Sequence, residues 1–174
     1  MYHNNMEGRG VSNPNEAFDP HLPGLQYGVL DELTGYALRR AQLLITQAFD
    51  AAFGPEGITT QRFSALTLIA LNPGMSQTRL AHAIGASRPQ ITVVVDALLE
   101  LGLVERRPAP TDRRSVSLHL TAQGAETFPR LATRVRAHDA RQTLALTPTQ
   151  IDDLRRLLGG LGAGPANPTG AAHG

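Results

Sequence analysis

The sequence of 174 residues contains no cysteine, no tryptophan and, among its 16 basic side chains, no lysine. Without cysteine, the chain can form no disulfide bond, no thiol redox switch and no thiolate metal site. No apolar run approaches the roughly 18–20 residues that a membrane-spanning helix needs. The first residues lack the basic and then apolar order of a signal peptide, so we expect a cytoplasmic protein with no membrane partner.

The net charge is only +1 at pH 7, but the arginines are unevenly distributed. Between Glu105 and Arg141 the sequence has eight arginines against four acidic residues. These arginines are Arg106, Arg107, Arg113, Arg114, Arg130, Arg134, Arg136 and Arg141. A local basic surface attracts a polyanion even when the total charge is balanced. A genome bias would explain the missing lysine, but not this clustering.

The order of the predicted elements indicates a mainly α-helical protein between two irregular ends. Residues 1–28 are rich in Asn, Gly and Pro and predict a flexible arm, and residues 162–174 predict a frayed tail. Periodic apolar residues and caps predict helices over residues 31–53, 60–71, 76–84, 87–101, 121–146 and 147–161. Pro129 falls inside the fifth of these, where it should kink or interrupt the helix.

The fourth predicted helix has clear boundaries. Ser87 and Gln90 have capping-box spacing, and Pro89 falls in the first turn, where its missing N–H would be unpaired anyway. The apolar stripe of this helix is Ile91, Val94, Val95 and Leu98. Burial of that stripe leaves the N-terminal end exposed, with Arg88 on it.

A β-hairpin is expected directly after this helix, over residues 103–107 and 115–120. In PAPTDRRSVSLHLTAQG, residues 108–124, alternate residues from Val116 to Leu120 are apolar, which is typical of a half-buried strand. Asp112, Arg113 and Arg114 then stand at the tip. Such a ribbon can hold two arginines beside a DNA backbone or in the narrow minor groove.

A short helix, a turn, a second helix and a hairpin together make the layout of a winged helix-turn-helix. The N-terminal residues of a recognition helix meet base edges, where Arg pairs with guanine and Gln with adenine. The candidate DNA contacts are Ser76, Thr78, Ser87, Arg88, Pro89, Gln90, Thr92, Arg107, Asp112, Arg113 and Arg114. The alternatives are an ordinary amphipathic helix with a solvated face, a charged solvated hairpin tip, or a winged helix that only docks proteins.

The stretch LAHAIGASRPQITVVVDALLELGLVERRPAPTDRRSVSLHLTAQG resembles the DNA-binding domain of the MarR family of transcriptional regulators. The matching parts are LA..IGAS, LLELGLVERR, and DRRS followed by LT..G, and the resemblance extends over residues 30–161. It implies a homodimer that binds a pseudo-palindromic operator in double-stranded DNA, represses transcription and releases DNA when a small molecule binds. Pro89 departs from the family pattern, which usually has a polar residue there.

The resemblance also divides the chain into functional regions. It places a helical dimerisation region at residues 29–58 and 122–161 and the winged helix-turn-helix at residues 59–121. The first and last helices carry more apolar surface than one small lobe covers, notably Leu43, Leu44, Ile151, Leu154, Leu157 and Leu158. Pairing about a two-fold axis would bury them and set the recognition helices one DNA turn apart. Packing within one subunit is the alternative.

The first long helix contains two arginines among apolar residues, in GYALRRAQLL. Members of the family that respond to aromatic acids carry a similar pair, so the resemblance makes Arg39 the candidate clamp for an aromatic carboxylate effector. The other residues expected to line that pocket are Tyr36, Gln42, Phe49, Phe63 and Leu66. On this interpretation Arg40 points further away. An exposed arginine pair, or one that bridges to Asp31 or Glu32, is the alternative.

No motif in the sequence indicates an enzyme, a cofactor or a metal site. We find no phosphate-binding Gly loop, no nucleophile elbow and no His paired with a carboxylate at a useful spacing. The histidines show no paired helical spacing, and His82 and His119 are expected to be surface or packing residues. A DNA-binding protein that responds to no ligand remains a second alternative.

Overall fold

The computed structural model describes residues 21–108 and 116–161, in which the chain forms six α-helices and three short β-strands. The chain divides into two compact units between Phe63 and Ser64. Within the described residues, no helix is long and apolar enough to cross a membrane. The prediction of a mainly α-helical protein with a small β wing is confirmed.

The first unit is built on one long helix. A 3₁₀ turn, η1 (Gly28–Glu32), precedes α1 (Thr34–Phe53), and η2 (Gly54–Glu56) follows it. The predicted helix begins three residues later than expected, because Leu33 has an extended backbone. Gly57 has φ 74° and its N–H donates to the carbonyl of Gly54 at 2.8 Å, which ends η2 before α2 (Thr60–Leu71) begins.

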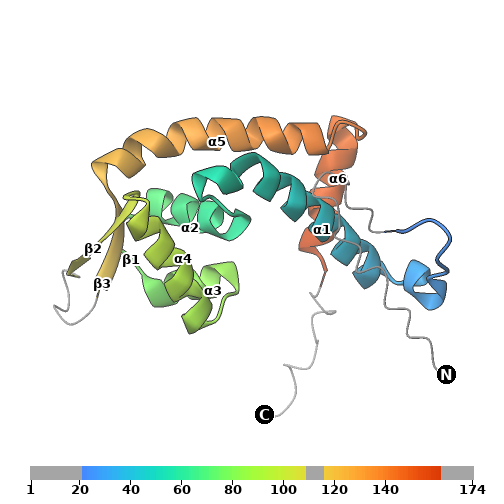
Figure 1. Cartoon of the computed structure of the whole chain (residues 1–174), viewed down its shortest axis with the longest axis horizontal. Coiled ribbons are helices and arrows are strands. Elements are labelled where there is room, and N and C mark those ends of the chain that lie inside the picture. The colour runs from blue at the N-terminus through green and yellow to red at the C-terminus, as the bar shows by residue number, and fades with distance from the viewer. Residues whose placement is uncertain (1–20, 109–115, 162–174) are drawn as a thin grey trace, which may run out of the picture. The chain divides into compact units, whose positions relative to one another are not determined.

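The second unit contains the helix-turn-helix (Figure 1). Strand β1 (Met75–Ser76) leads into α3 (Gln77–Ile84), and α4 (Arg88–Glu100) follows after a tight turn. Ser76 caps α3, since its hydroxyl oxygen accepts from the N–H of Arg79 at 3.3 Å. Gly85 has φ 72° and closes α3 with the αL geometry that glycine adopts at little cost.

In the second unit, side chains from helices α2, α3 and α4 and from strand β3 form the hydrophobic core. Its fully buried large side chains are Leu66, Ile69, Leu80, Ile91, Val95, Leu98 and Leu118. The predicted stripe on α4 is therefore confirmed: Ile91, Val95 and Leu98 are fully buried, and Val94 nearly so. Burial of each such side chain contributes roughly 1.5–3 kcal/mol. Because these residues lie on one side of α4, the opposite side faces outward.

The wing is the outer part of a three-stranded antiparallel sheet with the order β1-β3-β2. Strand β2 (Val104–Pro108) pairs with β3 (Val116–Leu120) in a register that sets Arg106 opposite Leu118. Strand β1 pairs with β3 on the other side, with Met75 opposite Leu118. The sequence predicted only the two-stranded hairpin, because a two-residue strand is too short to show an alternating pattern.

The expected alternation along β3 is wrong at its first two positions. Val116 is exposed, whereas Ser117 is buried. Strand β3 lies in the centre of the sheet, and the hydroxyl of Ser117 donates to the carbonyl of Arg107 at 3.1 Å and contacts Nε2 of His119 at 3.1 Å. Ser117 is therefore buried with hydrogen-bond partners, which removes the usual cost of burying a polar group.

Helix α5 (Ala122–Gln142) is continuous through Pro129, so of the two expected effects, a kink or an interruption, the interruption does not occur. Proline removes a single intrahelical hydrogen bond, and burial of the following residues Leu131 and Ala132 holds the helix on one side. The helix ends at Gln142 and not at the predicted Leu146. Directly after this end, the hydroxyl of Thr143 donates to the carbonyl of Asp139 at 3.1 Å.

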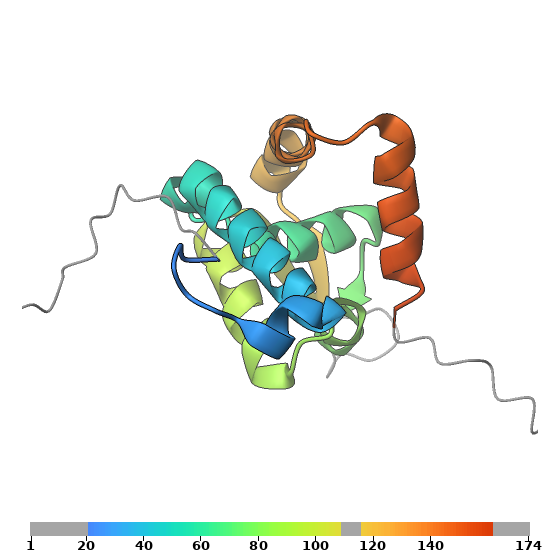
Figure 2. The same ribbon diagram turned by 90° about the vertical axis from the view of Figure 1, so that its right-hand side faces the viewer.

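Helix α6 (Pro148–Gly159) turns away from the axis of α5 (Figure 2). The predicted cap is confirmed: the N–H of Thr147 donates to Oε1 of Gln150 at 2.8 Å, and the hydroxyl of Thr147 accepts from the N–H of Gln150 at 3.3 Å. No residue of α6 is buried. Its leucines are therefore available to a further surface.

The join between the wing and α5 explains the LT..G part of the sequence. The hydroxyl of Thr121 donates to the carbonyl of Gly102 at 2.6 Å and accepts from the N–H of Gly124 at 2.9 Å, so it caps α5 and ties it to the end of α4. A Cβ on Gly124 would lie 2.0 Å from the carbonyl oxygen of Leu103. That oxygen also accepts from the N–H of Thr121 at 3.1 Å, so it is not free to move.

We expect Gly124→Ala to lower the free energy of unfolding by about 1–3 kcal/mol or more, because the methyl group has to displace backbone. The matched control is Gly35→Ala in α1, where a Cβ meets nothing within 4 Å. That change should raise the free energy of unfolding by about 0.4–1 kcal/mol. Urea unfolding at a fixed protein concentration measures both. Equal midpoints for the two variants would contradict the close approach of α5 to Leu103.

Candidate nucleic-acid interface

The N-terminus of α4 is exposed and is shaped by its own cap. The N–H and the hydroxyl of Ser87 both donate to Oε1 of Gln90, at 2.9 and 2.8 Å, which completes the predicted capping box. Pro89 occupies the first turn, as expected. The free N–H groups and the dipole at this end favour a negative charge, and Arg88 adds a full positive charge beside them.

The hydrogen bonds of the cap restrict how the side chain of Gln90 can bind a base. Bidentate reading of adenine needs both the oxygen and the nitrogen of the amide group. Because Oε1 already accepts two hydrogen bonds from Ser87, that pairing would first require the cap to open. Loss of a cap costs about 0.5–2 kcal/mol. The contact of Gln90 with a base therefore stays a prediction, and it would require the free energy of opening the cap.

Thr92 links the two helices of the motif. Its hydroxyl oxygen accepts from Nε2 of Gln77 at 2.8 Å, and its hydroxyl hydrogen is donated to the carbonyl of Arg88 at 2.9 Å. The hydroxyl of Thr92 thus both accepts and donates a hydrogen bond within the protein. Gln77 is a residue that the sequence did not single out, because a contact across fifteen positions leaves no local pattern.

A shallow hollow of about 220 Å³ lies where α3 and α4 meet. It is lined by Gln77, Thr78, Arg88, Ile91 and Thr92. Among the described residues the guanidinium of Arg88 has no ion-pair partner, and the side chain is exposed. The hollow therefore presents a free cation at its rim, next to the exposed helix terminus.

An ion pair joins α4 to the wing. Nη2 of Arg106 donates to Oδ1 of Asp96 at 2.7 Å, which ties the middle of α4 to strand β2. Both side chains are partly exposed, 39% for Arg106 and 47% for Asp96, so the pair contributes no more than about 1 kcal/mol. The sequence missed this pair, because it depends on the position of the strand relative to the helix.

Arg107, a predicted DNA contact, is paired within the strand. Its Nε donates to Oε1 of Glu105 at 2.9 Å, and its Nη2 contacts the same oxygen. A phosphate would have to compete with this carboxylate for the guanidinium. Asp112, Arg113 and Arg114, predicted for the tip of the wing, lie outside the described residues.

The predicted DNA-binding residues that the structure describes fall in two groups. Helices α3 and α4 and the residues that cap them hold one group: Ser76, Thr78, Ser87, Arg88, Pro89, Gln90 and Thr92. Strand β2 carries Arg107. Both groups belong to the winged helix-turn-helix, in which β2 is a strand of the sheet and α3 and α4 contact its strands (Figure 1).

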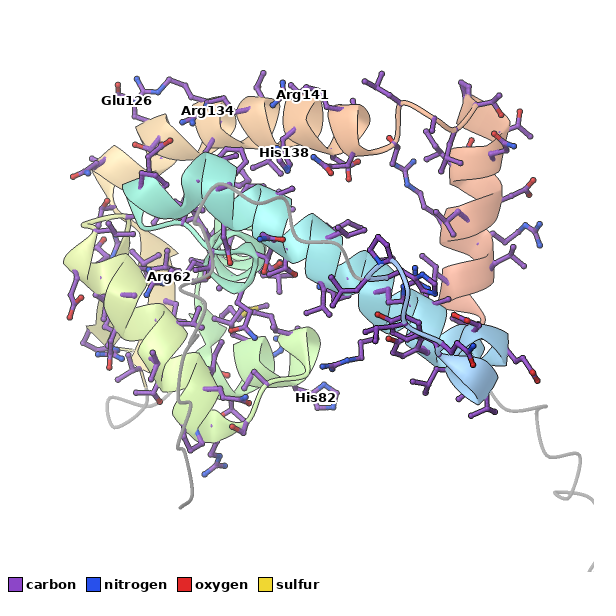
Figure 3. The ribbon with its side chains drawn as sticks, turned by 45° about the vertical axis from the view of Figure 1, so that its right-hand side comes forward. Arg62, His82, Glu126, Arg134, His138 and Arg141 are labelled. Carbon is purple, nitrogen blue, oxygen red and sulfur yellow. The ribbon has the colours of Figure 1, made fainter. Side chains whose placement is uncertain are left out.

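The histidines that the structure describes in this unit do not form a metal site. His82 is exposed and projects outward from α3 (Figure 3), and His119 contacts the hydroxyl of Ser117 at 3.1 Å. Across residues 21–108 and 116–161, no cluster of three or more His, Asp or Glu side chains has the arrangement of a metal site.

The arginine pair of α1 differs from what we expected of it. Arg39 is exposed, whereas Arg40 is the more buried of the two, which corrects the view that Arg40 points further away. Nη1 of Arg40 lies 3.8 Å from Oδ1 of Asp31, and its guanidinium stacks 5.8 Å from the ring centroid of Tyr36. The bridge to Asp31 that we considered for the pair is thus made by Arg40. Arg39 has no ion-pair partner among the described residues.

The other predicted ligand residues are only partly brought together. The rings of Phe49 and Phe63 lie 6.3 Å apart, and the rings of Phe49 and Phe53 lie 4.6 Å apart with their planes tilted by 35°. Nε2 of Gln42 donates to the hydroxyl of Thr46 at 3.1 Å. Leu66 is fully buried. The grouping of these residues around one effector stays a prediction.

The model of the MarR family matches residues 56–115, which include the helix-turn-helix and strand β2. A transcriptional regulatory protein for the hcr operon of Thauera aromatica is 36% identical over 151 residues, which are 84% of this chain and 91% of that relative.

Three solved structures resemble the chain over most of their length. The transcriptional repressor CouR bound to a 23-mer DNA duplex is 40% identical, with a TM-score of 0.72 over 78% of this chain and 96% of that chain. CouR bound to p-coumaroyl-CoA is 36% identical, with a TM-score of 0.71 over 79% and 96%. A MarR family protein of Mycobacterium tuberculosis in complex with p-aminosalicylic acid is 31% identical, with a TM-score of 0.59 over 75% and 98%.

A double-mutant cycle on Asp96→Asn and Arg106→Gln should give a coupling energy of about 0.2–1 kcal/mol at low salt, which shrinks at 1 M salt as the exposed charges are screened. Urea unfolding of the four proteins measures it. Glu126 and Arg130, an exposed pair one turn apart on α5 with N and O 3.2 Å apart, supply the matched control cycle, with about 0.3–0.5 kcal/mol expected. Zero coupling between Asp96 and Arg106 at low salt would show that the bridge does not form in solution.

Proposed function

This chain belongs to the MarR family of transcriptional regulators, and we propose that it is a repressor that binds a pseudo-palindromic operator as a homodimer. An aromatic carboxylic acid or its CoA thioester releases it from DNA. The relatives named above are regulators of transcription and not enzymes, so the function lies in binding and in the coupling between two ligands.

The observation that carries the DNA-binding part is the exposed N-terminus of α4. Burial of Ile91, Val95 and Leu98 turns the opposite side of the helix outward, and Arg88 stands at its start with no ion-pair partner among the described residues. A recognition helix contacts base edges with this end. CouR, which shares 40% of its residues with the chain, was solved on a DNA duplex.

The proposed dimer is supported by the apolar surface of the outer helices. On α6 the leucines Leu154, Leu157 and Leu158 are 41–61% exposed, and Leu43 and Leu44 of α1 are similarly exposed. Leucines three and four positions apart lie on one face of α6, and such an exposed apolar face favours a partner surface. Two-fold pairing would present two recognition helices to the two halves of a symmetric operator.

Release by an effector requires that the effector bind the DNA-free state better than the DNA-bound state. The proposed class of effector follows from the relatives, one solved with p-coumaroyl-CoA and one with p-aminosalicylic acid. Arg39 is the proposed anchor, because its guanidinium has no ion-pair partner among the described residues, whereas Arg40 is engaged by Asp31 and Tyr36. A planar guanidinium pairs equally well with a carboxylate or a phosphate.

The DNA-binding proposal is tested on a duplex selected from a random library with the purified full-length protein. Arg113→Ala and Arg114→Ala should each weaken binding of that duplex and reduce the slope of log K against log salt by about 0.9 for each phosphate that is no longer neutralised. The control Arg141→Ala removes the same charge from α5 (Figure 3) and should leave the slope unchanged. Fluorescence anisotropy measures affinity, and sedimentation confirms that the oligomer is intact. A protein-docking module would select no duplex.

The effector proposal is tested by displacement of the same labelled duplex with p-coumaric acid, p-aminosalicylic acid, p-coumaroyl-CoA and free CoA. Arg39→Ala should raise the concentration needed for release at least tenfold and leave the affinity for DNA unchanged. Arg40→Ala is the matched control and should keep the response. Release by the thioester but not by the acids would assign Arg39 to a phosphate. An unchanged response in Arg39→Ala would exclude it as the anchor.

A further inference from the structure

The outward side of α4 has few side chains left with which to read bases through hydrogen bonds. Oε1 of Gln90 accepts two hydrogen bonds from Ser87, and the hydroxyl of Thr92 is used by Gln77 and by the carbonyl of Arg88. The carboxylate of Asp96 is paired with Arg106 at 2.7 Å. Bidentate pairing of Gln90 with adenine, and donation by the hydroxyl of Thr92, would each first require the loss of a partner inside the protein.

Near the N-terminus of α4, one cation and two apolar side chains are also exposed. Arg88 lies at the start of the helix, Pro89 lies in its first turn, and Val93 follows Pro89 by four positions. Residues four apart lie one above the other on a helix, so Pro89 and Val93 form one apolar row. Val93 is 65% exposed although its neighbours Val94 and Val95 are buried.

An exposed valine on a helix is unfavourable on two counts. The β-branched side chain loses rotamer freedom in a helix, and its apolar surface stays in contact with water. One exposed apolar residue by itself is ordinary on a protein surface. At Val93 it coincides with the face of the helix that points away from the core, one turn from the free Arg88, and that is the face which the proposed function turns to DNA.

We infer that Val93 is a specificity-determining residue that contacts the C5-methyl group of a thymine in the major groove. This inference rests on the proposed DNA-binding function. Of the four bases, thymine alone presents a methyl group in the major groove, and apolar side chains read it. Arg88, at the adjacent turn, pairs with a guanine through N7 and O6. Each operator half-site therefore carries a thymine close to a guanine, read by Val93 and Arg88.

Uracil substitution tests this without any other change to the duplex, because deoxyuridine differs from thymidine only by the missing methyl. The probe is the duplex selected from a random library with the full-length protein, in which each thymine is replaced in turn by uracil. With the wild-type protein, one thymine in each half-site should show about fourfold weaker binding, the factor that burying one methyl group gives. Other thymines should tolerate the change.

Val93→Ala shows whether Val93 is the reader. Alanine has the higher helix propensity, so the fold should persist, which circular dichroism and thermal melting verify. The variant should bind the thymine duplex about fourfold more weakly and should bind the uracil duplex no worse than the thymine duplex. The matched control Leu71→Ala removes an exposed apolar side chain at the end of α2 and should keep the fourfold discrimination.

The outcomes separate the two proposals. If the library selection enriches no sequence, the proposed DNA-binding function fails, and this inference fails with it. If a half-site is enriched but every thymine tolerates uracil, the inference alone is overturned. It is also overturned if Val93→Ala keeps the full uracil penalty, because another group then reads the methyl.

Discussion

Burial of one stripe of α4 is the constraint on which the rest of the winged helix depends. Ile91, Val95 and Leu98 are fully buried in the same core as Leu118 of the central strand. At roughly 1.5–3 kcal/mol for each side chain, this burial outweighs the polar contacts around it, most of which are exposed. It fixes the rotation of α4 about its axis, and so decides which residues the helix can offer to a partner.

The polar residues of α4 and of its N-terminal cap mainly form hydrogen bonds and ion pairs within the protein itself. Ser87 and Gln90 cap the helix, Thr92 binds Gln77 of α3, and Asp96 holds Arg106 of the wing. A helix terminus whose side chains are already held by hydrogen bonds is preorganised. Binding of a partner therefore does not carry the entropic cost of ordering these side chains. Arg88 and the apolar row of Pro89 and Val93 are exposed at this end of α4, and Arg88 has no ion-pair partner among the described residues.

The local elements could be predicted from the sequence where caps and glycines mark them. Ser76 and Gly85 bound α3, and Thr147 with Gln150 starts α6, because each signal acts within one helical turn. The predictions failed where the deciding contact is distant. Strand β1 exists only through its pairing with β3, and Ser117 is buried because β3 is central in the sheet. Pro129 leaves α5 intact because packing outweighs one missing hydrogen bond.

The order of the helices, their caps, the apolar stripe of α4 and the likeness to a family of regulators can be read from the amino-acid sequence, since they depend on neighbouring residues. The packing of the chain reveals which arginine of α1 is engaged, which polar side chains of α4 are already bonded, and why position 124 is glycine. These two sets of features differ in the range of the interactions behind them. Propensity and capping act over three or four positions, whereas ion pairs, hydrogen bonds between elements and backbone approach depend on how distant segments pack.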